Sequence, residues 1–306
     1  MPPGGASLRH EAGERIWHAM TRPRPPGIAL PPPGAILAIA AGAAAILAAE
    51  RWRPARRRTQ AEPRRVARNL ALGALSMAVV SAIEDPVVKP LTHRAQRRRR
   101  GLVQRLPLPA AARDALAFLA MDYTIYLWHV LTHKVPALWR LHLVHHVDLD
   151  LDASTALRFH AADMLVSTPY RALQVAALGV SPRAFAAWRA FFFLSVLFHH
   201  SNLRLTARWE RRLSLLLTTP LMHAIHHTAA RDRTDSNWSS GLSLWDRLHG
   251  TFRLDAPPAG APIGVPGYRE PSGIALRPSL TLPFVRQRDA WRPEAARGTD
   301  TGRSPP

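Results

Sequence analysis

Apolar residues are gathered into five runs that are separated by polar stretches rich in arginine. No alternation of apolar and polar residues is long enough to predict a β-strand. A helix needs about 20 apolar residues to span a bilayer, and several runs approach that length. We therefore predict an all-α protein with a multi-pass bundle of membrane helices. The runs cover residues 34–49, 70–83, 115–128, 164–180 and 184–198.

Two features of these runs carry specific expectations. Residues 70–83 stop at Glu84 and Asp85 and are short for a span, so we expect this run to be re-entrant or tilted. Ser181 and Pro182 form a tight break between the fourth and fifth runs, and this break predicts a helical hairpin.

Composition divides the chain into four segments. Residues 1–27 are expected to be disordered, and residues 28–113 to hold the first membrane helices and basic loops. Residues 114–255 form a histidine-rich domain, and residues 256–306 a tail rich in proline, glycine and arginine. The end of that tail, roughly 288–306, is also expected to be disordered.

The charge of the chain is strongly positive, with 41 basic and 21 acidic residues giving +20. Only Lys89 and Lys134 are lysines, so the excess is almost all arginine. Runs such as Arg56 to Arg58 and Arg97 to Arg100 lie between apolar stretches, which favours an anionic membrane surface as their partner. We expect no nucleic-acid partner, because no zinc-knuckle or RNA-binding pattern is present. Arginine-rich segments flank residues 70–83 on both sides, so the positive-inside tendency does not settle the orientation.

Histidine is the residue that points to chemistry. Of the fifteen histidines, His10, His18 and His93 are isolated, whereas the other twelve lie between His129 and His249. The chain has no cysteine, so a metal site must use His, Asp or Glu.

Three groups of histidines have the spacing of ligands on helices. Residues at i and i+4 lie one turn apart on one face, and a triplet at i, i+3 and i+4 covers an arc of about 100°. We expect each triplet to aim its imidazoles at one centre. Pro136 breaks the chain between the first two groups, while Thr219 can cap and Pro220 can begin the helix of the third. The groups are His129 and His133; His142, His145 and His146; and His223, His226 and His227.

Three further residues have supporting context. Asp122 lies seven residues before His129 on the same helical face, where it is expected to hold a ligand imidazole. His160 follows an acidic stretch and His200 ends the fifth apolar run, and we count both as candidate ligands. Imidazole binds zinc, iron, copper and nickel. Eight to ten histidines exceed the capacity of one ion, so we predict two ions about 3.5–4 Å apart.

At these residues the chain resembles the fatty acid hydroxylase / sterol desaturase superfamily of integral-membrane enzymes. The resemblance covers about residues 115–284 and includes the stretches DYTIYLWHVLTH, FHHSNL, LMHAIHH and SNWSSGLSLWDRLHGTF. It implies a membrane helical bundle with a cytosolic di-metal region. It also implies that the metals are two iron ions, held by the three histidine groups with His160 and His200. Asn237, Trp245 and Asp246 fall in the segment that closes the site, and we count Asp122, Asn237 and Asp246 as candidate catalytic residues.

The chain departs from the family pattern at three places. The family often has Arg where this chain has Val130, and Asn-Tyr-Gly where this chain has Asn237-Trp238-Ser239. It usually has Phe where this chain has His249. These departures bear on the fit of the substrate more than on the metal site, because no histidine of the three groups is lost.

The resemblance implies a membrane di-iron oxygenase that hydroxylates or desaturates a sterol, fatty acyl chain or related lipid, with O2 as co-substrate. The chain has no haem, flavin or iron–sulfur motif, so a separate reductase or ferredoxin-like protein is expected to donate the electrons. Two alternatives stay open. One is a membrane metal-dependent hydrolase, although such sites usually include a carboxylate ligand; the other is a metal-binding protein without catalytic activity.

Overall fold

The computed structural model describes residues 33–255 and 261–292. Within these ranges the regular secondary structure is helical, apart from three isolated β-bridges. Contacts divide the chain into two units, Met1–Ala38 and Ile39–Pro306, and the text below concerns the second. The disorder predicted for residues 1–27, and for residues 293–306 of the predicted stretch 288–306, lies outside the described residues. The prediction was wrong for residues 288–292, because Ala290 is buried in a hydrophobic core and Trp291 packs against it.

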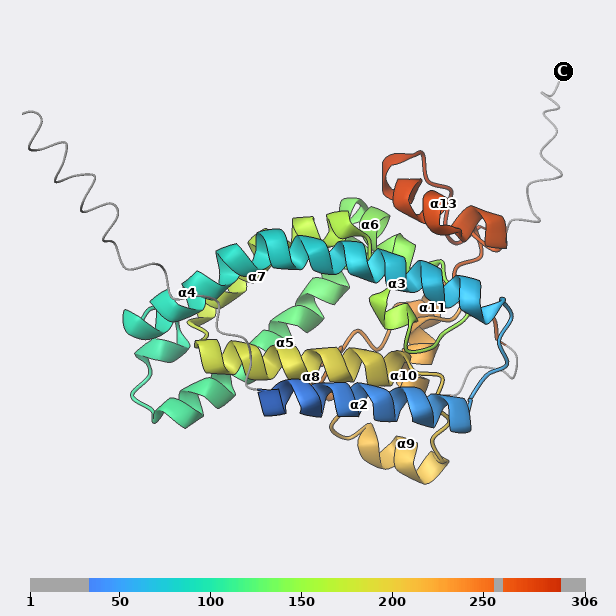
Figure 1. The fold of residues 1–306 in the computed structure, drawn as a ribbon. Helices are drawn as coiled ribbons and strands as arrows, with labels where there is room; N and C mark the ends of the chain where they lie inside the picture. Colours follow the sequence, from blue (N-terminus) through green and yellow to red (C-terminus); the bar gives the residue numbers. More distant parts are fainter. Residues whose placement is uncertain (1–32, 256–260, 293–306) are drawn as a thin grey trace, which may run out of the picture. The chain divides into compact units, whose positions relative to one another are not determined.

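The five apolar runs become long helices, as predicted. Figure 1 shows α3, η1 and α4 as one continuous helix, with α2 and α8 running beside one another. Within the described part of the chain, three stretches are long and apolar enough to cross a membrane: Gly34–Trp52, Glu62–Arg97 and Ala110–Lys134. The helices are α2 (Pro33–Trp52), α3 (Glu62–Val79), the π-helical turn η1 (Val80–Glu84), α4 (Asp85–Arg97), α5 (Ala110–Lys134), α7 (Ala161–Leu178) and α8 (Pro182–His200).

The second helix is much longer than the apolar run that predicted it. Instead of stopping at Glu84 and Asp85, it runs for 36 residues from Glu62 to Arg97. The expectation of a short span was therefore wrong. Asp85 can lie within this helix because its carboxylate pairs with Lys89 at 2.7 Å and with Arg189 of α8 at 2.5 Å. Paired charges of this kind are far less costly to bury than isolated ones.

A tight turn joins α7 to α8 as predicted, but the two helices diverge from it: α7 packs against α3 and α4, and α8 against α5 and α10, so the predicted hairpin is open rather than packed. Gly179 ends α7 in the left-handed conformation, with φ at 77°. The hydroxyl of Ser181 accepts a hydrogen bond from the amide of Ala184 and so caps α8, which Pro182 begins. The backbone of Gly179 also lies so close to Gly101 that a Cβ on Gly101 would be 2.3 Å from it. Both glycines are therefore needed where the loop before α5 meets the hairpin.

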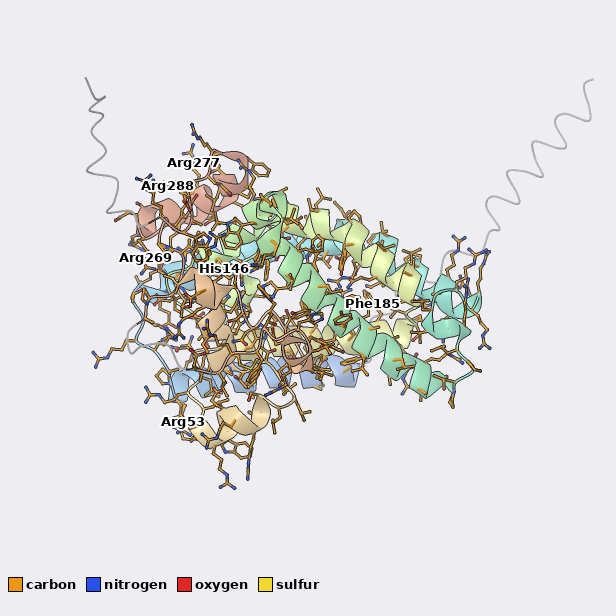
Figure 2. The ribbon with its side chains drawn as sticks, turned by 180° about the vertical axis from the view of Figure 1, so that it is seen from behind. Arg53, His146, Phe185, Arg269, Arg277 and Arg288 are labelled. Carbon is orange, nitrogen blue, oxygen red and sulfur yellow. The ribbon has the colours of Figure 1, made fainter. Side chains whose placement is uncertain are left out.

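Shorter elements gather at the ends of these helices that carry the histidines, except η2, which lies at the opposite ends beside Gly179. Residues 261–292 of the predicted tail belong here: Val265, Tyr268 and Ile274 pack in one hydrophobic core with Leu72 and Leu143. Figure 2 places His146 near the C-terminal segment that bears Arg269 and Arg288. The elements are η2 (Val103–Arg105), α6 (Pro136–His146), η3 (Thr155–Leu157), α9 (Ala207–Leu213), α10 (Pro220–His226), α11 (Arg231–Thr234), α12 (Leu244–Leu248), η4 (Pro271–Ile274), α13 (Leu276–Thr281) and η5 (Leu282–Phe284).

A buried ionic network fixes the loop that follows α6. Arg65 of α3 donates to Asp148 at 2.9 Å and to Asp152 at 2.5 Å, and all three side chains are almost fully buried. Burial alone would raise the pKa of Asp148, but Arg65, Arg158 and Arg68 outweigh it and hold the pKa well below its usual range. The acidic stretch after the second histidine group is thus an anchor to the long helix α3.

Candidate metal centre

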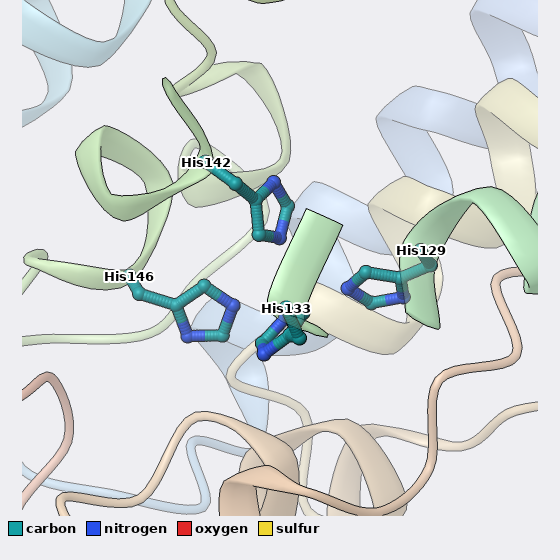
Figure 3. Close-up of side chains that lie close together, drawn as sticks. All are labelled: His129, His133, His142 and His146. Carbon is teal, nitrogen blue, oxygen red and sulfur yellow. The ribbon is translucent and has the colours of Figure 1, made fainter. Parts of the chain in front are cut away.

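Helices α5 and α6 present the first two histidine groups to each other. Val135 leaves the helical conformation, and Pro136 begins α6 at its first position, as the sequence predicted. This break turns His142 and His146 of α6 toward His129 and His133 of α5. Figure 3 shows the four rings pointing toward a common space.

A first group of ligand atoms comes from these four histidines. One ring nitrogen of each lies within 4.8 Å of the others. His226 of α10 joins them, because its ring centroid lies 4.8 Å from those of both His129 and His133. We call His129, His133, His142, His146 and His226 the first group. The Nε2 atoms of His133, His142, His146 and His226 are buried and have no hydrogen-bond partner within the described residues.

A second group is built around the Nε2 atoms of four other histidines. His200 Nε2 lies 3.0 Å from that of His145 and 2.9 Å from that of His223. His223 Nε2 lies 3.1 Å from that of His227. Two nitrogens bound at right angles to one ion, each about 2.1 Å from it, are about 3.0 Å apart. We call His145, His200, His223 and His227 the second group, and their spacing fits ligands of a shared ion.

Both triplets divide between the two groups, so the expectation that each triplet aims at one centre was wrong. In α6, the i and i+4 residues His142 and His146 enter the first group, whereas the i+3 residue His145 enters the second. In the triplet of α10, the i and i+4 residues His223 and His227 enter the second group, whereas the i+3 residue His226 enters the first. The i+3 and i+4 positions point about 100° apart around a helix, and this angle is wide enough to face two centres.

Backbone carbonyls fix which ring nitrogen faces the centre. The Nδ1 atoms of His129 and His226 lie 2.7 and 2.8 Å from the carbonyl oxygens of Trp238 and Ser236. Nδ1 of His200 lies 2.8 Å from the carbonyl oxygen of Val196. A carbonyl only accepts, so each Nδ1 carries the proton and leaves the Nε2 lone pair for a metal.

The electrostatics of the site also favour neutral imidazoles. Burial is the main reason that the pKa values of four histidines lie well below the usual value, and the neighbouring imidazoles lower them further. These four are His145, His146, His223 and His227. Burial likewise lowers the pKa of His226 to about 3. Neutral imidazoles with unpartnered nitrogens in a buried space are the state that a metal ion requires. The residues therefore fit a pair of metal ions, and imidazole suits iron, zinc, copper or nickel.

Asp122 of α5 touches different partners from the one expected. Its Oδ2 accepts hydrogen bonds from the amide of Leu242 at 3.0 Å and from Nε1 of Trp245 at 2.7 Å. Its Oδ1 is buried without a hydrogen-bond partner in the described part of the chain. A Cβ on Gly241 would lie 2.3 Å from this oxygen, so the glycine is needed for the close approach. In the structure Asp122 thus binds the segment 241–245 to α5, rather than a ligand imidazole.

Asp246 and Asn237 shape the loop that supplies the carbonyls. Asp246 accepts hydrogen bonds from the amides of Trp238 at 2.9 Å and Ser239 at 3.0 Å, which directs the Trp238 carbonyl toward His129. Asn237 adopts a positive φ of 52°. Its amide group donates to the carbonyls of Met222 and Arg253, each at 2.8 Å. Both residues thus act on the ligands through the backbone.

The structure does not bring His160 into either group. Its Nδ1 accepts a hydrogen bond from the amide of Ala162 and caps α7, while Nε2 lies 3.1 Å from the carbonyl oxygen of Leu280. Sequence reasoning also missed Asp163, whose Oδ2 lies 3.8 Å from Nδ1 of His142. Its place three residues after His160, in the first turn of α7, was the available signal.

Two further histidines, His199 and His249, lie outside the predicted ligand set. His199 is buried with its ring centroid 4.0 Å from that of His223, but it does not join the converging nitrogens of the second group. His249 is exposed, and its Nε2 lies 3.2 Å from the hydroxyl of Tyr123 on α5.

Comparison with known proteins gives one family. Residues 115–251 match the family described as fatty acid hydroxylase. The ornithine lipid hydroxylase OlsE of Rhizobium tropici is 28% identical over 58% of this chain and 52% of its own length. The human alkylglycerol monooxygenase is 31% identical over 45% of this chain and 30% of its own length. A cholesterol 25-hydroxylase-like protein of Danio rerio is 28% identical over 46% of this chain and 55% of its own length.

The chain spans about half of the bacterial relative and about a third of the human one. No solved structure matches the chain significantly.

Proposed function

Because the chain is a member of the fatty acid hydroxylase superfamily, we propose that it is a membrane di-iron oxygenase that hydroxylates a lipid. The observation that carries this proposal is the convergence of nine imidazoles, eight of them on buried residues and His133 partly buried, in two groups at the end of the membrane helices. No carboxylate belongs to either group, which disfavours a hydrolytic metal site. Hydroxylation is preferred over desaturation because the relatives are named as hydroxylases or monooxygenases.

We assign the ligands of the two irons to the first and second groups and leave His160 out. Iron held there would supply the activation of O2 that oxidises an unreactive C–H bond. The reaction converts a substrate C–H bond, O2, two electrons and two protons into C–OH and water. The desaturation that remains as an alternative also uses O2, two electrons and two protons, but it breaks two C–H bonds on adjacent carbons and yields a C=C bond and two water molecules.

The protein's own part in this reaction is to hold the ligands rigidly and keep the site dry. The carbonyls of Trp238 and Ser236 orient His129 and His226, and Asp246 and Asn237 hold those carbonyls in place. We therefore propose that Asp246 and Asn237 are positioning residues. Burial of the rings limits the entry of water, which protects an oxidising centre from side reactions.

A lipid substrate and a separate electron donor complete the proposal. The chain has no cysteine and hence no thiolate-bound iron–sulfur cluster, and we propose that a separate protein donates the electrons. We place the histidine groups on the cytoplasmic side, where soluble carriers and reductases are available. Arginines lie at both ends of the helices, as at Arg56 to Arg58 and Arg97 to Arg100, so charge alone does not select this orientation.

The test is isotopic. Cells with and without the gene are grown under ¹⁸O2, and their lipids are compared by mass spectrometry. The proposal expects a lipid that gains one ¹⁸O atom only when the gene is present, and that is missing when the gene carries His145→Ala. Lipid profiles that are the same in all three strains, with the protein present in the membrane, would contradict an oxygenase.

A further inference from the structure

Five large apolar side chains near α5 are exposed: one on α9, two on the segment 214–218 that follows it, and two on α12. The segments 214–218 and 241–247 lie side by side, because Leu217 and Leu242 form a β-bridge and the amide of Ser243 donates to the carbonyl of Leu216 at 3.1 Å. Helix α9 leads directly into the first segment and lies at the edge of the structure in Figure 1. We call these side chains the apolar shelf: Trp209 (52% exposed), Leu215 (61%), Leu216 (70%), Leu244 (49%) and Leu248 (66%).

The apolar shelf is attached to a helix that is long and apolar enough to cross a membrane. Asp122 of α5 accepts hydrogen bonds from Leu242 and Trp245, and the ring of Tyr123 lies 5.0 Å from that of Trp245. Asp122 is six residues before Trp128, where the apolar run of α5 ends. With a rise of about 1.5 Å per residue, the attachment lies about 9 Å inside that end. Helices that rest in a membrane interface are buried to a depth of about 5–10 Å.

Charged residues beside the apolar shelf match the headgroup layer. Arg208, Arg211 and Arg212 of α9 are exposed, and the Arg212 guanidinium lies 5.9 Å from the ring of Trp209. Glu210, on the same helix, is buried. Tryptophan prefers the membrane interface, and arginines near an anionic surface bind its phosphates. Five large apolar side chains beside one another are unusual on a surface that faces water.

We propose that the apolar shelf inserts into the lipid leaflet on the histidine side, with the arginines of α9 at the phosphates of anionic lipids. The occupant is the bilayer itself, because the apolar shelf is attached at Tyr123 of α5, one helical turn after the exposed Leu119 on the same face of that apolar helix. The segment that ends in the shelf also carries the carbonyls of Ser236 and Trp238. Insertion therefore anchors the loop that orients two histidines of the first group, and it holds the centre at the level where a membrane lipid is accessible. This inference depends on neither iron nor turnover.

The absence of cysteine makes the test direct. Single cysteines replace Leu216 or Leu248, and each is spin-labelled in full-length protein reconstituted into phosphatidylcholine vesicles containing phosphatidylglycerol. The relaxation of each spin label by O2, which dissolves in lipid, is compared with its relaxation by a nickel chelate, which stays in water. Leu119, exposed on α5, serves as the lipid control, and Asp232, whose side chain is 75% exposed, as the water control.

Both shelf labels are expected to resemble the Leu119 label, with a ratio of O2 to nickel accessibility several-fold above that at Asp232. In R208Q/R211Q/R212Q, or in vesicles without phosphatidylglycerol, the ratio at both positions should fall toward the water control. Nickel access equal to that at Asp232 would overturn the proposal. Exclusion of both reagents would also overturn it, because protein rather than lipid would then cover the apolar shelf. Loss of iron or activity leaves these readings unchanged, so failure here is distinct from failure of the oxygenase proposal.

Discussion

The two histidine groups share their short helices but not their supports. In each triplet the i and i+4 residues belong to one group and the i+3 residue to the other. The i and i+4 residues of α6 belong to the first group, and those of α10 belong to the second. Both groups therefore depend on both short helices. Each long helix contributes to one group only. Helix α5 contributes His129 and His133 to the first group, and α8 contributes His200 to the second.

The supports of the two groups differ in kind. His200 in the second group is oriented by the carbonyl of Val196, one turn earlier in its own helix. His129 and His226 in the first group are oriented by carbonyls of the loop residues Trp238 and Ser236. A carbonyl within a helix is held by the helix itself, whereas a loop carbonyl needs further contacts to stay in place. The first group should thus be sensitive to loop residues that leave the second group intact.

Loss of a ligand should have the largest effect, and it should reach both groups. We expect His145→Ala and His226→Ala to abolish product formation and to lower iron well below two ions per chain. Each removes a nitrogen from a different group, and the two ions are needed together for the reaction. The measurement is iron per chain by mass spectrometry together with product formation, with membrane-inserted protein quantified alongside.

His93→Ala is the matched control for these two variants. His93 lies on α4, outside both groups, and should leave iron and activity unchanged. If His145→Ala kept both at wild-type levels, the two-group assignment would collapse.

The next effect distinguishes the two groups. Asp246→Asn replaces a carboxylate oxygen by a donor, so the amide of Trp238 or of Ser239 loses its acceptor. The Trp238 carbonyl should then turn away from His129. We expect iron affinity and turnover to fall about 10–100-fold, the usual cost of losing a residue that orients a ligand.

The loss from Asp246→Asn should be confined to the first group. Mössbauer spectra of ⁵⁷Fe-loaded protein should show one altered iron environment and one that is retained. Asp232→Asn, at an exposed aspartate, is the control. Equal changes in both environments would show that the loop supports the whole site rather than the first group.

A smaller effect on the same group is expected at Asp163. Its carboxylate lies 3.8 Å from Nδ1 of His142, which is beyond hydrogen-bonding distance and allows only a weak orienting attraction. Asp163→Asn should lower turnover by less than about 10-fold and leave two irons per chain. A loss of iron as large as that in His145→Ala would mean that Asp163 itself is a ligand.

Sequence predicted the helices and all nine histidines that converge, and added only His160 wrongly, because helices and ligand spacing both depend on local patterns. Helical spacing brought together the three groups, and Pro136 and Thr219 marked where their helices turn or begin. The division of each triplet was not predicted, since spacing gives the angle between two side chains but not the number of centres that they face. That number depends on where α5 and α8 lie.

Contacts between residues far apart in the sequence account for the other differences between the sequence predictions and the structure. The helix from Glu62 to Arg97 continues past two acids because Arg189, more than a hundred residues later, pairs with Asp85. Asp122 has the helical spacing of a residue that holds His129, but its carboxylate accepts hydrogen bonds from Leu242 and Trp245 instead. Neither partner can be identified from a pattern within one helix.

The smallest effect is expected at His160, and it separates a ligand from a helix cap. The sequence placed His160 among the ligands, whereas the structure gives its Nδ1 to the amide of Ala162 and puts its Nε2 beside the carbonyl of Leu280. His160→Ala should therefore keep two irons per chain and cost about 1 kcal/mol of stability, as removal of an N-cap does. His160→Asn should recover most of that stability, because asparagine is a good N-cap but cannot replace a metal-bound imidazole. Thermal unfolding and iron content are measured for both variants in the same detergent. If both variants lost one iron equally, His160 would be a ligand and the second group would have to rearrange to include it.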